Sequence, residues 1–89
     1  MRAYNNGEKL FLVTKMCKLA AQSNNSNSYV ADQLISSWLT AYGRNSLNNI
    51  SWMTDDMAES TMNFFLEINF VSVEEFKSVQ LIQEESLAA

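Results

Sequence analysis

The chain has 89 residues and a net charge of −4; 47% of its residues are apolar, 11% aromatic and 18% charged. This length predicts a single helical domain spanning residues 1–89, with a modest core. The chain has no histidine and one cysteine, Cys17. That composition excludes an intramolecular disulfide and a thiolate metal cluster, and it removes the commonest general base and transition-metal ligand.

The spacing of apolar residues predicts an all-α protein. Proline is absent, glycine occurs twice, and apolar residues recur with a period near 3.6 rather than 2. We expect a small irregular bundle of four main helices, at about residues 8–22, 29–42, 55–69 and 73–86, plus a short helix near 46–53.

The first predicted helix has a broad apolar face. Its apolar positions are Leu10, Leu12, Val13, Met16, Cys17, Leu19 and Ala20. Glu8, Lys15, Lys18 and Gln22 form the opposing polar stripe, and Phe11 falls inside that stripe. Phe11 either leans over its neighbours or marks a contact surface. Within this helix we expect the cysteine to be a buried structural thiol.

A polar Asn- and Ser-rich connection leads to the second predicted helix, for which Ser28 is the expected N-cap. The apolar face of this helix comprises Val30, Ala31, Leu34, Ile35, Trp38, Leu39 and Tyr42. Gly43 is the expected left-handed C-cap, and Arg44 lies near the negative end of the helix.

The third predicted helix begins at Thr54, whose hydroxyl can cap it, and Asp55 and Asp56 occupy its first turn. Its apolar face consists of Met57, Ala58, Met62, Phe65 and Ile68. Phe64 and Leu66 widen this arc, which suggests that the helix is covered on more than one side.

Residues 72–75, with the sequence Ser-Val-Glu-Glu, predict a capping box at the start of the last helix. Val71 and Phe76 are placed for a hydrophobic staple, and we expect Val73, Phe76, Val79 and either Leu81 or Ile82 to face inward. A β-strand over residues 78–83 is the alternative, because apolar and polar residues alternate there.

Charge is divided unevenly along the chain. Residues 1–44 carry five basic and two acidic side chains, whereas residues 45–89 carry one basic and eight acidic ones. One interpretation is that the carboxylates solvate helix surfaces and stabilise helix starts. The other is that they dock on a basic surface of another protein. For that docking surface the candidate residues are Glu59, Glu67, Glu74, Glu75, Glu84 and Glu85.

The aromatic residues indicate a second kind of contact. Ten of them occur in this short chain, and aromatic side chains are favoured in protein interfaces. We expect a homodimer, with an interface formed by Trp38, Tyr42, Trp52, Phe64 and Phe70. The alternative is that these rings fill one ordinary core.

Residues 42–52 resemble the turn and recognition helix of helix-turn-helix regulators, which often carry a glycine in the turn and a Ser-x-x-x-Ile-Ser run. Two positions depart from that pattern: the interval from Gly43 to Ile50 is one residue longer, and Leu39 replaces the customary alanine. The resemblance implies a DNA-reading segment over residues 44–52. DNA binding requires Lys and Arg for phosphate contacts, and Arg44 is the only basic residue there.

The remaining features argue against catalysis. The sequence contains no Gly-rich phosphate loop, calcium-binding loop or Glu-x-x-His motif, so we expect no enzymatic activity, metal or cofactor. It also shows no secretory signal and no membrane-length apolar run, so we expect a cytoplasmic protein without membrane contact.

We therefore expect a small acidic protein that regulates or inhibits another protein by direct contact. Phage-, plasmid- and island-encoded accessory proteins have this general character. A helix-turn-helix-like transcriptional regulator is the alternative, and a structural subunit of a larger assembly is a third interpretation.

Overall fold

The computed structural model describes residues 3–22 and 25–79, and over these residues the all-α prediction is confirmed, with no strand. The elements in chain order are α1 (Asn6–Ala21), α2 (Ser26–Tyr42), the 3-10 turns η1 (Arg44–Leu47) and η2 (Ile50–Trp52), α3 (Asp55–Glu67) and a helix over residues 73–79.

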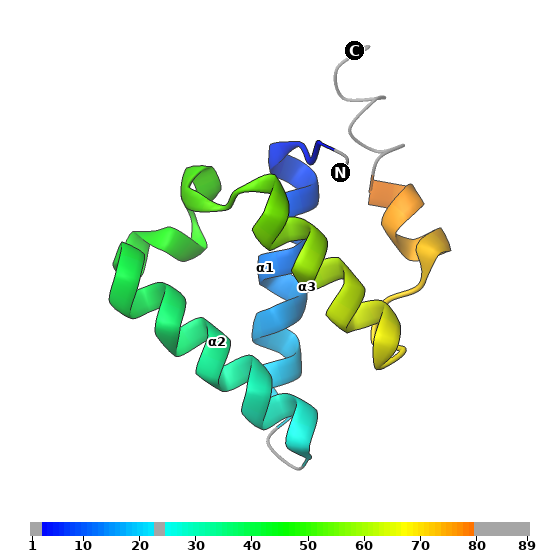
Figure 1. Cartoon of the computed structure of the whole chain (residues 1–89), viewed down its shortest axis with the longest axis horizontal. Helices are drawn as coiled ribbons and strands as arrows, with labels where there is room; N and C mark the ends of the chain where they lie inside the picture. Colours follow the sequence, from blue (N-terminus) through cyan, green and yellow to red (C-terminus); the bar gives the residue numbers. More distant parts are fainter. Residues whose placement is uncertain (1–2, 23–24, 80–89) are drawn as a thin grey trace.

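Helix α1 is the centre of the arrangement. In Figure 1, α2 and α3 run in opposite directions in front of α1, and the helix over residues 73–79 lies beyond α3. Both α2 and α3 pack against α1, but their backbones make almost no contact with each other. The two helices are therefore separated by a gap that has α1 behind it.

Both N-terminal helices begin earlier than expected because asparagine side chains cap them. The Glu8 N–H donates to Asn5 Oδ1 and the Asn5 N–H donates to Glu8 Oε1, both at 2.8 Å. Asn25 makes the same reciprocal pair with Ser28. Ser28 is thus the third residue of α2 rather than its N-cap, and Glu8 is buried in its capping box instead of lying on an exposed polar stripe.

Helix α3 starts as predicted but ends two residues early. The Thr54 hydroxyl accepts a hydrogen bond from the Met57 N–H at 3.2 Å. At the C-terminus Asn69 adopts a left-handed conformation, with φ 58°. The Phe70 N–H donates to the Phe65 carbonyl and the Asn69 N–H to the Leu66 carbonyl, which is the Schellman pattern. The rings of Phe65 and Phe70 lie 5.6 Å apart across it.

The last helix forms half of the predicted capping box. The Glu75 N–H donates to Ser72 Oγ at 3.0 Å, while the Glu75 carboxylate lies 2.6 Å from Lys15 Nζ on α1. Phe76 is buried, as expected, but Val73 is 46% exposed and does not face inward. The remainder of the predicted helix, the strand alternative over 80–83, and Leu81 and Ile82 lie outside the described residues.

The short helical segment predicted near 46–53 is present as the two 3-10 turns, which fold back on themselves. The Trp52 indole N–H donates to the Ser46 carbonyl at 2.8 Å, and Ile50 and Met53 point into the core. Gly43 is the C-cap of α2, as predicted, but its φ of 87° and ψ of 171° lie outside the left-handed helical region that was expected.

The core lies between α1 and the other helices. Its buried apolar side chains are Tyr4, Leu12, Val13, Met16, Leu19, Ala31, Trp38, Ile50, Met53, Ala58, Met62, Phe65, Val71 and Phe76. Several expected inward residues are exposed instead: Leu10, Val30, Leu34 and Tyr42. Phe11 is half-buried because the helix over 73–79 packs on its side of α1, with the Phe76 ring 5.9 Å away.

Candidate functional site: the groove between α2 and α3

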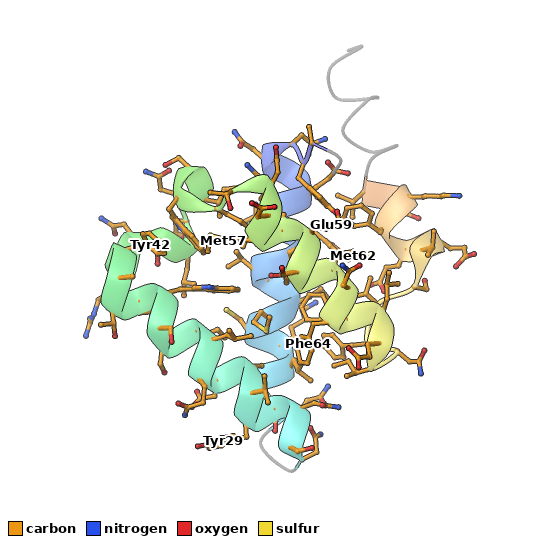
Figure 2. The ribbon with its side chains drawn as sticks, viewed as in Figure 1. Tyr29, Tyr42, Met57, Glu59, Met62 and Phe64 are labelled. Carbon is orange, nitrogen blue, oxygen red and sulfur yellow. The ribbon has the colours of Figure 1, made fainter. Side chains whose placement is uncertain are left out.

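The gap between α2 and α3 contains a groove of about 290 Å³. It is lined by Met16, Leu34, Trp38, Asp56, Met57, Ser60, Thr61 and Phe64. Figure 2 shows Met57 and Phe64 on the side of α3 that faces α2. Five of the eight lining side chains are apolar and one is charged, a composition typical of binding sites for apolar ligands or peptide segments.

The floor of the groove is closely packed. Met16 of α1 is fully buried and Trp38 of α2 is 7% exposed. The Trp38 ring packs 5.3 Å from the Trp52 ring, which stacks at 4.7 Å on Tyr42. Since Trp52 is held by its hydrogen bond to the Ser46 carbonyl, the Trp38 ring is fixed from behind.

The walls are accessible and apolar. Leu34 of α2 is 36% exposed, and Met57 and Phe64 of α3 are half-buried. Methionine adapts its shape to different partners because its unbranched side chain has several rotatable bonds. The Thr61 hydroxyl donates to the Met57 carbonyl at 2.8 Å, so its hydrogen-bonding capacity is largely satisfied within α3.

The rim of the groove is acidic and polar. Asp56 and Ser60 lie one turn apart on α3 and are both exposed. The two wall helices, α2 and α3, contain five carboxylates and no lysine or arginine. Described basic side chains instead lie on α1, η1 and the helix over residues 73–79.

The predicted acidic docking residues do not form one free surface. Glu59 accepts a hydrogen bond from the Tyr4 hydroxyl at 2.5 Å, and Glu75 is paired with Lys15. Glu67 and Glu74 are exposed on different elements, and Glu84 and Glu85 lie outside the described residues. Local contacts therefore account for two of the six candidates.

The aromatic residues predicted for a dimer interface also separate. Trp38 is in the groove floor, Tyr42 and Trp52 stack behind it, and Phe64 is in the groove wall. Phe70 packs on Phe65 at the far end of α3. Of the five, only Trp38 and Phe64 line the groove between α2 and α3, while Tyr42 and Trp52 line a separate hollow.

Sequence reasoning missed Leu34, Met57 and Asp56 as site residues. The sequence pattern assigns Leu34 to the buried face of α2, and it assigns Asp56 to the first turn and polar face of the third predicted helix. One signal was present in the sequence: Met57 and Phe64 lie seven residues apart, at the edge of an apolar arc too wide for one contact face. The apolar arc of α3 could not identify the opposite wall of the groove, because that wall belongs to α2, which is distant in the sequence.

Other chemistry is sparse among the described residues. They contain no group of three histidine, cysteine or carboxylate side chains able to hold a metal ion. Cys17 is half-buried rather than buried as expected, and this partial burial raises the pKa of its thiol. No helix within residues 3–22 and 25–79 is both long and apolar enough to cross a membrane.

Comparison with protein-family models gives no match, and comparisons with curated proteins and with solved structures give no significant match. A proposal of function therefore depends on the chemistry of the groove and of the charges around it.

Proposed function

We propose that this protein regulates or inhibits another protein by holding a segment of it in the groove between α2 and α3. The observation that carries the proposal is the open apolar hollow on a closely packed floor, with accessible walls from Leu34, Met57 and Phe64. Exposed apolar concavities of this kind are favoured sites for protein contacts.

The groove favours binding over catalysis. Its polar side chains are one carboxylate and two hydroxyls, Asp56, Ser60 and Thr61. Acid–base or nucleophilic catalysis needs a nucleophile within reach of a base, and these three side chains form no hydrogen bond with one another; the Thr61 hydroxyl donates to the Met57 carbonyl instead. We therefore keep the proposal of a non-enzymatic protein.

DNA reading through residues 44–52 remains the alternative, and the local geometry favours it less. Two short 3-10 turns replace a continuous helix there, whereas a recognition helix presents several turns to the major groove. A gel shift at low salt tests this alternative: binding that weakens steeply with added salt would support it.

The homodimer also remains a prediction, and sedimentation of the purified chain tests it. The separation of Phe70 from Trp38 and Phe64 argues against one continuous aromatic interface. Most of the aromatic surplus is instead used in ring contacts within the chain.

Partner capture with matched variants tests the proposed function. Leu34→Glu places a charge in the groove wall, while Leu66→Glu makes the same change at a residue of α3 outside the groove lining. The two leucines are equally accessible, at 36% and 37% exposure, so we expect similar and small stability losses. A protein retained from cells of the source organism by wild type and Leu66→Glu, but lost with Leu34→Glu, would support the proposal. Retention by both variants would contradict it.

A further inference from the structure

We propose that the segment bound in the groove is an amphipathic helix whose polar flank carries lysine or arginine. This inference rests on the proposed function and specifies the chemistry of the partner. It follows from the spacing of the groove walls and from the sign of the charges around them.

The two walls offer apolar stripes at helical spacing. On α2, Val30, Leu34 and Trp38 follow one another at intervals of four residues, and Val30 and Leu34 are exposed. On α3, Met57 and Phe64 are separated by two turns. At 1.5 Å per residue each stripe extends over about 10 Å, which matches apolar residues at positions i, i+3 or i+4 and i+7 of a bound helix.

The arrangement leaves a place for one more helix. Helices α2 and α3 both pack on α1 but not on each other (Figure 1). A helix lying in front of the gap would contact both of them and cover the apolar floor formed by Met16 and Trp38. Such a helix covers the apolar stripes of both walls. An extended strand fits less well, because strand addition requires a sheet edge and the described residues contain no strand.

The charged side chains of the two wall helices are all acidic. Asp55 is engaged by the Tyr4 N–H at 3.0 Å and by Lys9 at 3.9 Å, and Glu59 by the Tyr4 hydroxyl. Asp56 and Glu67, by contrast, are exposed and have no ion pair among the described residues. Their spacing of eleven residues places both on the groove side of α3, about 16 Å apart, so they bracket the Met57–Phe64 stripe.

Two basic residues about three turns apart on the bound helix would meet these two carboxylates. A second copy of this chain fits less well, because its own α2 and α3 bring five more carboxylates and no basic residue. Residues 80–89 also lack complementary charge, since their sequence contains two glutamates and no lysine or arginine. Like charges brought together in this way oppose binding.

A displayed peptide library tests the inference. Helical peptides of about four turns would keep apolar residues at i, i+3 or i+4 and i+7, with all flanking positions randomised. Selection uses the immobilised full chain, with Leu34→Glu as the counter-selection target. We expect the retained peptides to be enriched in lysine and arginine on one flank.

Variants of single carboxylates then locate the charge contact. For a retained peptide we expect binding to weaken about threefold with Asp56→Asn and about tenfold with Asp56→Lys, as for a solvent-exposed ion pair. Binding to the wild type should also weaken at ~1 M salt, because salt screens such pairs. Asp32→Lys is the matched control, because Asp32 is an exposed carboxylate of α2 outside the groove lining. We expect it to change binding by less than about twofold.

The possible results separate this inference from the proposed function. Peptides enriched over the Leu34→Glu control but with neutral or acidic flanks would overturn the basic partner and leave groove binding standing. No enrichment over that control would overturn the helical partner, and partner capture that does not differ between wild type and Leu34→Glu would then be needed to overturn groove binding. An equal loss with Asp32→Lys and Asp56→Lys would overturn the assignment of the contact to the groove rim. A dimer of the wild type that Leu34→Glu dissociates would make a second copy the occupant and overturn the inference.

Discussion

Phe76 holds the C-terminal helix against α1, and its replacement by alanine offers a quantitative test of the packing. The ring is 3% exposed and lies 6.1 Å from the Tyr4 ring and 5.9 Å from the Phe11 ring. Burial of a phenylalanine removes about 150–250 Å² from water, equivalent to about 4–6 kcal/mol at ~25 cal/mol per Å². Alanine retains part of this, so the expected loss from Phe76→Ala is about 3–5 kcal/mol.

In Phe76→Ala the loss of stability should first affect the helix over residues 73–79. The helix over residues 73–79 is otherwise held mainly by buried Val71 and by the ion pair between Lys15 and Glu75. Its undocking therefore requires less free energy than unfolding of the whole domain. We expect amide exchange to accelerate over residues 73–79 before α1, α2 and α3 are affected.

Urea denaturation followed by tryptophan fluorescence gives the global free energy of unfolding, and hydrogen exchange gives the local one. Val73→Ala is the control: Val73 is on the same helix but 46% exposed, so we expect a change within about 0.5 kcal/mol. A loss below about 1 kcal/mol for Phe76→Ala, together with unchanged exchange over 73–79, would refute this account of the packing.

Three further predictions concern single residues. Ser46 Oγ is buried without a hydrogen-bond partner among the described residues, so Ser46→Ala should raise the free energy of unfolding by about 1 kcal/mol in urea denaturation. A decrease in the free energy of unfolding would instead show that the Ser46 hydroxyl makes a hydrogen bond. Asn69 has φ 58°, so Asn69→Ala should lower the free energy of unfolding by about 1–2 kcal/mol, while Asn69→Gly should not lower it. Equal losses of stability in the two variants would contradict the left-handed cap. Burial raises the pKa of the Cys17 thiol above that of an exposed cysteine, which lowers its thiolate fraction at neutral and mildly alkaline pH. Alkylation by iodoacetamide should therefore be slower in the folded chain than in urea, and a pH–rate midpoint for the folded chain at or below the midpoint in urea would contradict this.

Helix starts depend on neighbouring residues, and for that reason several were predictable. Thr54 and Ser72 each bond to a backbone N–H three residues ahead, and no distant contact is needed for that geometry. Asn5 and Asn25 follow the same rule. They were missed because each lies in a run of polar residues that offers several capping candidates, from which only the folded chain selects one.

The faces of the helices could not be assigned from periodicity alone. Leu34 continues the apolar arc of α2 yet is exposed, because α3 does not approach that side of α2. Phe11 falls in a polar stripe yet is half-buried, because a segment more than sixty residues later packs over it. The angle between two helices depends on side chains from both of them, and a local pattern contains only one.

The acidic character of the second half of the chain was evident from the sequence. The helical class and two of the four described helix starts, those of α3 and of the helix over residues 73–79, were also predictable, since they depend on composition or on residues within one turn. Only the tertiary structure decided which carboxylates are engaged and which are exposed. It paired Glu59 with Tyr4 and Glu75 with Lys15, and left Asp56 at the rim of an apolar groove. That groove exists because α2 and α3 both pack on α1 and not on each other, a relation between distant segments that no local pattern encodes.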